Sequence, residues 1–202
     1  MSKFVQSLQV LLFVAVFALA GRAHAALDVF IKFETPSVGA PVIEGTTLDT
    51  DMKGCSEVSE VSFGIENVST IGSASGGAGA GKAKFNDISI KVLASKITTQ
   101  LFLACAKGGH YSKVTIYFRP SGAAASKVPK PTFVVTLGMV FVKSIELGGS
   151  NGDDRATSSI SLQCGSMKLE TYDQAKGGEI SSKPTATAVW NVVNNSESEA
   201  NQ

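Results

Sequence analysis

The residues best suited to chemistry lie in a glycine-rich stretch, GGAGAGKA, which runs from Gly76 to Ala83. Gly76, Gly81 and Lys82 have the spacing G-x-x-x-x-G-K of a phosphate-binding loop, whose backbone amides and lysine hold the phosphates of a nucleotide. Such a loop also needs a hydroxyl residue after the lysine and a helix that begins there. Ala83 has no hydroxyl, and the residues after it alternate like a strand. We therefore interpret the glycines as a loop between two strands and expect no nucleotide binding.

A single histidine, His110, remains after the first 25 residues, so any Ser-His-Asp or Cys-His site would have to use it. It follows the glycines that end a helical pattern, and no nucleophile motif lies beside it. Asp153 and Asp154 lack the alternating spacing of a calcium-binding loop, so we expect a salt bridge or an interface contact with Arg155. We therefore expect a protein that is not an enzyme and binds no cofactor or metal.

The three cysteines, Cys55, Cys105 and Cys164, are widely separated and include no C-x-x-C pair, so zinc and thioredoxin-like sites have little support. One disulfide with one thiol left over could form in any of three pairings. The alternative is three small buried apolar residues. We favour this alternative because disulfide frameworks belong mainly to smaller secreted domains.

Residues 1–25 have the pattern of a secretory signal peptide. Lys3 gives a positive start, an unbroken apolar run of eleven residues covers 10–20, and Ala23-His24-Ala25 is a small-x-small cleavage site. A retained membrane anchor is the alternative, but eleven residues are too few for a span that needs about 20. We expect cleavage between Ala25 and Ala26, and a secreted or periplasmic protein.

The chain after residue 25 is long enough for one domain with a substantial core, and we place that domain at 26–193, before a disordered polar tail at 194–202. Without Lys3 and Arg22, the 18 basic residues become 16 against 17 acidic ones, a net charge of −1. This balance argues against a nucleic-acid partner. The 20 glycines and the many β-branched residues favour an all-β core.

Alternating apolar residues predict strands at about 27–33, 61–66, 88–92, 114–118, 132–147, 160–169 and 187–193. One helix is predicted after Ser95, and it ends at Gly108-Gly109. Gly138 is expected to mark a bend or bulge, and a bulge near Gly165 would explain the change of apolar register along 160–169. These elements predict a mainly β fold, a two-sheet barrel or sandwich with one helix at its side.

In this order, the elements resemble the haemolysin-coregulated protein (Hcp) family, whose members are tube subunits of type VI secretion systems. The resemblance runs from Leu27 to about Val193. It is carried by Trp190 near the end of the chain and by the stretches LDVFIKF, GGAGAGKAKFNDISI, LFLACAKGGHYSKVTIYF, TFVVTLGMVFVKSIELGGS and TSSISLQCGSMKLETYDQ. No single stretch is specific, but their order and spacing are.

The resemblance implies a barrel that assembles into hexameric rings with an open channel, which stack into a tube. It also implies a spike protein and small effector proteins as partners, and a structural and carrier function without catalysis. The loop from Thr35 to Gly54, the glycine loop and the loop from Gly148 to Ser159 are long enough to reach neighbouring subunits. The last two hold our candidate contact residues, Gly76, Gly77, Lys82, Asp153, Asp154 and Arg155.

The leader distinguishes this chain from typical members of the family, which lack one because the tube is built in the cytoplasm. Two hypotheses follow. In the first, the chain is a ring-forming tube subunit or an exported relative of one. In the second, it is a secreted Hcp-like binding or effector protein that acts outside the tube apparatus. The size of the particle in solution separates the two hypotheses.

Overall fold

The computed structural model describes residues 26–67, 83–121 and 130–198. The expected leader and most of the glycine loop, including Gly76, Gly77 and Lys82, lie outside these residues. The described elements are β1 (Leu27–Pro36), β2 (Ser56–Glu57), β3 (Glu60–Ser62), β4 (Ile65–Asn67), β5 (Ala83–Phe85), β6 (Ile88–Leu93), α2 (Lys96–Lys107), β7 (His110–Pro120), β8 (Phe133–Gly148), β9 (Thr157–Thr171) and β10 (Ala186–Asn191).

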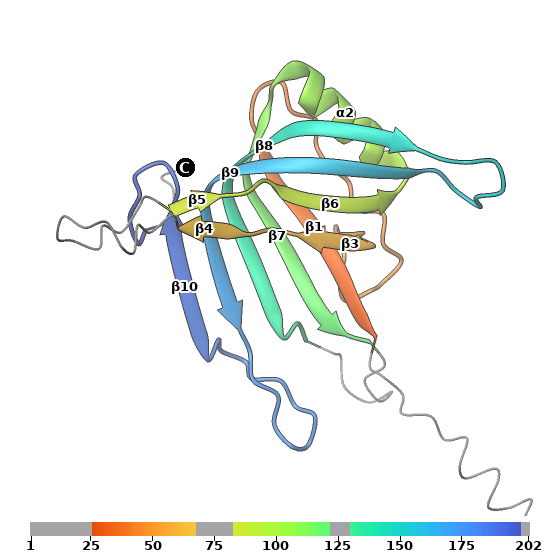
Figure 1. Ribbon diagram of the computed structural model, residues 1–202. Coiled ribbons are helices and arrows are strands. Elements are labelled where there is room, and N and C mark those ends of the chain that lie inside the picture. Colours follow the sequence, from red (N-terminus) through yellow and green to blue (C-terminus); the bar gives the residue numbers. More distant parts are fainter. Residues whose placement is uncertain (1–25, 68–82, 122–129, 199–202) are drawn as a thin grey trace, which may run out of the picture.

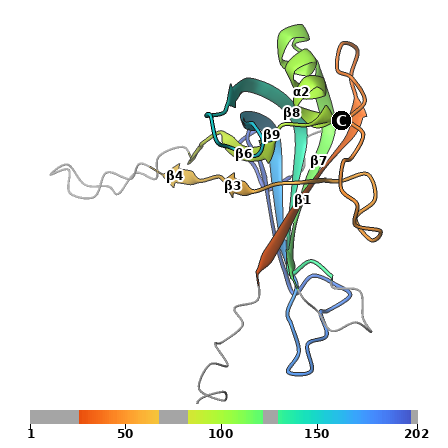
Figure 2. The ribbon, with the colours of Figure 1, turned by 90° about the vertical axis from the view of Figure 1, so that its right-hand side faces the viewer.

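One curled antiparallel sheet forms most of the fold, with the strand order β2-β1-β7-β8-β9-β6-β3 and with β10 also paired to β9 (Figure 1). The outer edge of β9 has two partners, because residues 157–162 pair with β6 and residues 166–171 pair with β10. In Figure 2 the lower parts of β7 to β10 stand as one upright layer, and the upper parts of β8 and β9 curve over. The prediction of a mainly β fold with one helix is confirmed.

The helix α2 forms where the sequence predicts it. At its start the Thr98 side chain accepts the backbone N–H of Ser95 at 3.3 Å, and Gly108 ends the helix in a left-handed conformation at φ 67°. Ile97, Leu101 and Ala104 are buried at a spacing of three to four residues, the period of one helix face. This face joins the main core, and the helix lies against β8.

The predicted strand at 61–66 is two strands. Residues 60–62 form β3 and pair with β6 in the main sheet, whereas residues 65–67 form β4 and pair with β5 in a separate two-stranded ribbon. Phe63 and Gly64 make the break. Alternation of apolar residues continues across it, so the sequence pattern does not reveal that the chain changes partners there.

A row of irregular residues crosses the sheet through Thr35, Ser112, Met139 and Gly165 on β1, β7, β8 and β9. Regular pairs flank the row on both sides, for example Glu34 with Lys113 and Pro36 with Tyr111 on the first two strands. Thr35 and Met139 both have φ of +48°, a left-handed conformation that is unusual for residues other than glycine.

At this row the core-facing residues of β7 and β8 change parity. Within each strand, the core residues on one side of the row have odd numbers and those on the other side have even numbers. Consecutive core residues are three positions apart, from Tyr111 to Val114 and from Leu137 to Val140, where alternation requires two. The expected bulge near Gly165 is therefore wrong, since the pairing of β8 with β9 keeps its register there. The one register shift between these strands lies between Val142 and Ser144, and the left-handed residue is Met139 instead of its neighbour Gly138.

The last described residues fold back onto β10. Asn191 donates its backbone N–H to Ser196 and receives one from it, and the Asn191 side chain accepts a hydrogen bond from the backbone of Asn194. The hydrogen-bonded chain therefore continues beyond Val193, where we expected the domain to end. Residues 199–202 lie outside the described part of the chain.

Candidate assembly site

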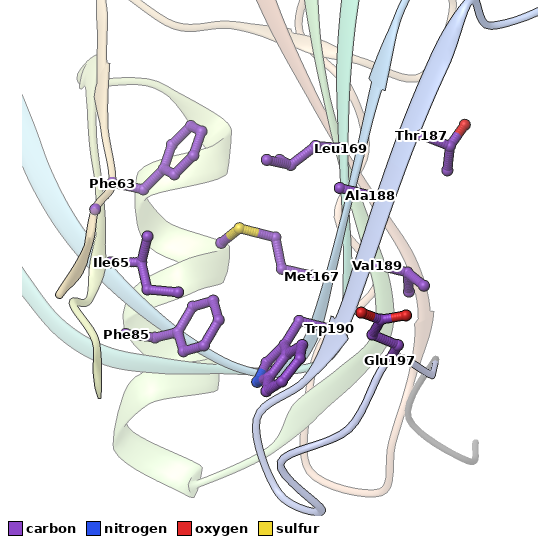
Figure 3. Close-up of a pocket in the computed structure, with 11 residues that line it drawn as sticks. Phe63, Ile65, Phe85, Met167, Leu169, Thr187, Ala188, Val189, Trp190 and Glu197 are labelled. Atoms are coloured by element: carbon purple, nitrogen blue, oxygen red, sulfur yellow. The ribbon is translucent and has the colours of Figure 1, made fainter. Parts of the chain in front are cut away.

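An apolar groove of about 660 Å³ separates the β4–β5 ribbon from the strands β9 and β10 (Figure 3). Each wall contains a pair of residues that lie directly opposite one another on neighbouring strands: Ile65 with Phe85 in the ribbon, and Met167 with Trp190 in the main sheet. Because paired residues point to the same face of a sheet, each pair forms one continuous apolar surface. Figure 3 shows the two surfaces facing each other, with Phe63 and Leu169 beside them.

The indole N–H of Trp190 has no acceptor among the described residues. The nitrogen Nε1 is buried, while the Trp190 side chain as a whole is half-buried beside the groove. A buried donor without an acceptor lowers the stability of the fold by roughly 1–3 kcal/mol. The N–H groups of buried tryptophans therefore usually have an acceptor. The groove therefore has an apolar lining, and beside it lies one buried donor that no described residue satisfies.

The groove was not predicted from the sequence. Trp190 was identified as part of the last strand and of the family resemblance, and Phe63 and Ile65 only as members of one alternating run. The signal that could have pointed to it is the single tryptophan of the chain near the end of a strand. Only the pairing of β10 with β9 brings Trp190 opposite Met167.

A rigid turn lies at the opposite end of the sheet, outside β2. Thr47 donates its backbone N–H to the carbonyl of Cys55, so residues 46 and 47 run beside the strand that ends the sheet. The carboxylate of Asp49 accepts hydrogen bonds from the backbone of Asp51 at 2.9 Å and of Met52 at 3.2 Å. Leu48, between these anchored residues, is 96% exposed.

Arg119 holds the turn from β7. Its Nη2 atom donates to Asp49 Oδ2 at 2.5 Å and to Asp28 Oδ2 at 3.1 Å, and its guanidinium lies 4.7 Å from the centre of the Phe30 ring. The Arg119 side chain is only 6% exposed. The hydrogen bond from Arg119 lowers the pKa of Asp49, and the same bond raises the pKa of Arg119. The ion pair therefore fixes the base of the turn that carries Leu48.

The hairpin between β8 and β9 carries the candidate contact residues Asp153, Asp154 and Arg155. Asp153 closes the turn on itself, because its side chain accepts the N–H of Ser150 at 2.8 Å and its own N–H donates to the Ser150 carbonyl. Arg155 donates to the carbonyl of Ala94 at 3.4 Å. All three residues are exposed, and no ion pair among the described residues joins either aspartate to Arg155. Their role in an interface stays a prediction.

The structure places the other residues considered for chemistry apart from one another. His110 stacks on Phe141 with ring centres 5.0 Å apart. The described residue that follows the glycine loop, Ala83, begins the strand β5, as the argument against a phosphate-binding loop requires. Across residues 26–67, 83–121 and 130–198, no group of three or more histidine, cysteine or acidic side chains could hold a metal ion.

All three thiols are free, and two of them are held in the protonated state by burial. Burial raises the pKa of Cys55, and it raises the pKa of Cys164 to about 11. Because the thiolate is the reactive form, neither thiol is suited to metal binding or disulfide exchange at neutral pH. The interpretation of the cysteines as small buried residues holds for Cys55, whereas Cys105 and Cys164 are only half-buried.

A sequence model of a known family, described as "Type VI secretion system effector, Hcp", matches residues 30–171. The chain belongs to the Hcp family. It is a type VI secretion tube protein of mainly β structure, and the match begins within β1, ends with β9 and includes α2. The turn at Leu48 and the groove residues from the ribbon and from β9 lie within the matched residues, whereas the groove residues from β10, including Trp190, lie beyond them.

Individual relatives agree with the family match. The protein hcp1 of Pseudomonas aeruginosa is 28% identical over 114 residues, which cover 56% of this chain and 68% of the relative. A solved structure of a type six secretion system protein has a TM-score of 0.73 at 20% identity, and it covers 85% of this chain and 99% of its own. The structure of Hcp1 from Salmonella typhimurium has a TM-score of 0.63 at 22% identity with the same coverage. These two structures show the shared fold.

Of the helices in the part of the chain that the structure describes, none is long and apolar enough to cross a membrane.

Proposed function

We propose that this Hcp protein is a ring-forming tube subunit that assembles as a homohexamer with an open channel. The observation that carries the proposal is that two of the edges of the curled sheet, at β10 and at β2, are different and open; a third edge lies at β3. Apart from the bridge between Asn191 and Ser196, no described strand pairs with the outer edge of β10, and β2 with its turn ends the sheet on the other side. Two different edges on one subunit make a heterologous contact, which closes into a ring when the rotation between subunits allows it.

An unpaired strand edge also gives a physical reason for assembly. The backbone groups along such an edge remain available for another chain, and proteins either protect the edge or use it. The six residues of β10 carry no charged side chain. Contact with a second copy covers this edge, and a permanent ring is expected to bury about 2,000 Å² or more at each contact.

We further propose that residues 1–25 are a signal peptide cleaved between Ala25 and Ala26. The apolar run and the Ala-His-Ala site support this. Mass spectrometry of the protein from its native host should find Ala26 at the N-terminus, and a retained Met1–Ala25 segment would contradict the proposal. Cleavage would place the subunit in the periplasm or outside the cell before assembly.

The leader also supports the second candidate function, a secreted Hcp-like protein that binds its target outside the apparatus. A spike protein and small effectors held in the channel are the partners that follow from the first function, and neither is needed for the second. The two functions differ in the particle that they require, since only the tube subunit must form a closed ring.

Recombinant residues 26–202 test the proposal directly. Light scattering after size-exclusion chromatography should give six times the subunit mass across a wide range of concentrations, and negative-stain images should show rings with a central pore. A strictly monomeric protein at high micromolar concentration would refute the ring and favour the second function. Rings that also lengthen into stacks would support a tube.

A further inference from the structure

We propose that the polar hollow beside Asp28 holds the α-ammonium group that cleavage before Ala26 creates, and that this group stabilises the mature fold. The group exists only if the leader is cleaved there, as proposed above, and the ring is not required for it. The hollow has a volume of about 280 Å³, and residues 27–30 of β1 form one side of it. Ala26 is the residue directly before them, and it carries the new terminus after cleavage.

The backbone of Ala26 is fixed at the edge of the sheet. Its carbonyl accepts the backbone N–H of Ser121 at 2.7 Å, which continues the pairing of β1 with β7 beyond Leu27 and Pro120. Figure 1 shows the start of β1 beside the end of β7. The nitrogen of Ala26 therefore has a defined place next to the hollow, whereas chain ends that are not tied down usually fray.

Ser121 also connects Ala26 to the acidic side of the hollow. Its hydroxyl donates to Asp28 Oδ1 at 2.5 Å, so the two residues that flank Leu27 contact the same serine. Alternate residues of a strand point to the same face and lie about 7 Å apart. The nitrogen of Ala26 is thus within about one Debye length of the Asp28 carboxylate, roughly 10 Å at 0.1 M salt, and a charge on it interacts with that carboxylate.

The charges around the hollow are not balanced. Its only basic lining residue is Arg119, and its acidic lining residues are Asp28, Asp49 and Glu57. The same atom, Nη2 of Arg119, donates to both Asp28 and Asp49, and the Asp28 side chain remains 39% exposed. Three carboxylates against one guanidinium leave a net charge of −2, which an ammonium group reduces to −1. The neutral peptide bond of an uncleaved chain supplies no such charge at Ala26.

Proteins that differ only at the N-terminus give the first test. Recombinant protein that begins at Ala26 is compared with a form that carries an uncharged Ser-Gly-Ser-Gly extension, which moves the ammonium group up to about 13 Å away. At pH 6.5 and low salt we expect the extension to raise the equilibrium constant of unfolding roughly 1.5- to 5-fold, the effect of an exposed ion pair. The difference should disappear in 1 M salt, where the Debye length is about 3 Å. Equal unfolding of the two forms at low salt would overturn the inference.

Asp28→Asn tests whether this carboxylate is the partner. In the Asp28→Asn background the effect of the extension should shrink by at least half, because the amide carries no charge. Asp51→Asn is the matched control, since Asp51 lies in the Leu48 turn but does not line the hollow. There the effect of the extension should stay as in wild type. An effect as large in Asp28→Asn as in wild type would contradict the proposed contact.

The protonation of the α-amino group gives a readout that does not depend on stability. The charged groups around the hollow are Asp28 on β1, Asp49 in the turn, Glu57 on β2 and Arg119 on β7. Because their net charge is negative, the pKa of the Ala26 amino group should lie above its ordinary range of about 7.7–8.0. Acetylation rates between pH 6 and pH 10, followed by mass spectrometry, measure this pKa. A value within or below the ordinary range would overturn the inference.

The raised pKa also fixes the sign of a pH dependence. A group whose folded pKa is raised stabilises the protein below its unfolded pKa, and this contribution is lost as the pH rises through the folded value. The extension should therefore have its effect at pH 6.5 and none near pH 10.5. An effect of the same size at both pH values would assign it to something other than the ammonium charge.

The cleavage and the role of the hollow fail separately. A mature N-terminus other than Ala26, found by mass spectrometry of the native protein, would overturn both the cleavage site and the role of the hollow. Ala26 at the native terminus together with equal unfolding of the two recombinant forms would overturn only the role of the hollow. Ala26 at the terminus together with an extension effect that depends on salt and on Asp28 would support both.

Discussion

Arg119 on β7 and Asp49 in the segment between β1 and β2 are joined by a hydrogen-bonded ion pair, with 2.5 Å between Nη2 and Oδ2. The two residues are 70 positions apart in the sequence. The pair connects the centre of the sheet to a segment that has no regular secondary structure before β2. The position of the Leu48 turn therefore depends on a contact between distant parts of the chain.

Replacement of Arg119 by methionine should destabilise the protein. The variant keeps the apolar part of the side chain but leaves Asp28 and Asp49 without their cation, and we expect a loss of roughly 1–3 kcal/mol in the free energy of unfolding. Urea denaturation at neutral pH measures this loss. Arg155→Met is the control, since Arg155 is exposed and should change stability by less than about 0.5 kcal/mol. Equal effects of the two variants would contradict the structural role of Arg119.

The same ion pair predicts a dependence on acid pH. Arg119 lowers the pKa of Asp49 in the folded state below the ordinary value of about 3.9. A carboxyl group with a lowered folded pKa contributes stability above its unfolded pKa and loses this contribution as the pH falls through the folded value. The difference in stability between wild type and Asp49→Asn should therefore be largest near neutral pH and should shrink below about pH 4.

Urea midpoints at pH 7, pH 4 and pH 2.5 check the acid prediction. Asp51→Asn is the control, because Asp51 lies in the same turn and makes no ion pair with Arg119. A stability difference for Asp49→Asn that stays constant over this range would show that the ion pair does not stabilise the fold.

Gly45 should tolerate no side chain. A Cβ atom at this position would lie 2.2 Å from the backbone carbon of Gly54 and 2.3 Å from the carbonyl oxygen of Cys55, so the two backbone segments at the base of the turn would have to separate. We expect Gly45→Ala to cost roughly 1–3 kcal/mol. Gly148→Ala has no atom within 4 Å of the added Cβ and should leave the thermal midpoint nearly unchanged. Similar midpoints for both variants would be inconsistent with this close approach.

Arg155→Glu should weaken the proposed ring if the hairpin between β8 and β9 is a subunit contact. The change places a third negative charge beside Asp153 and Asp154, and we expect the dissociation constant to rise at least about tenfold. Light scattering over a dilution series measures the effect, with Lys176→Glu as a charge reversal on a different loop. An unchanged oligomer would exclude the hairpin from the contact without affecting the ring.

The regular elements could be predicted because their signals are local. The spacing of Ile97 and Leu101, with Gly108 after them, determines a helix from a few neighbouring residues. Alternation likewise identified β1 and β6. The break at Phe63 could not be predicted, because alternation does not say which strand is the partner.

The candidate site could not be predicted for the same physical reason. Trp190 and Met167 become neighbours only when β10 pairs with β9, and Leu48 becomes a rigid exposed residue only when Arg119 reaches Asp49. The resemblance to the Hcp family predicted the fold and the function. The hairpin residues that we proposed as contacts do not line the groove, which lies on a different surface.

The irregular row through Thr35, Ser112, Met139 and Gly165 prevents the strands from sliding past one another. In a uniform antiparallel sheet, a slip of two residues restores the same side-chain faces and leaves most hydrogen bonds equivalent. Here such a slip would move the left-handed Met139 away from Gly165, where a Cβ atom would lie 2.8 Å from the Met139 side chain. To keep the irregular residues aligned, all four strands would have to slip together. Four strands thus share one irregular position, and this shared position favours a single register among them.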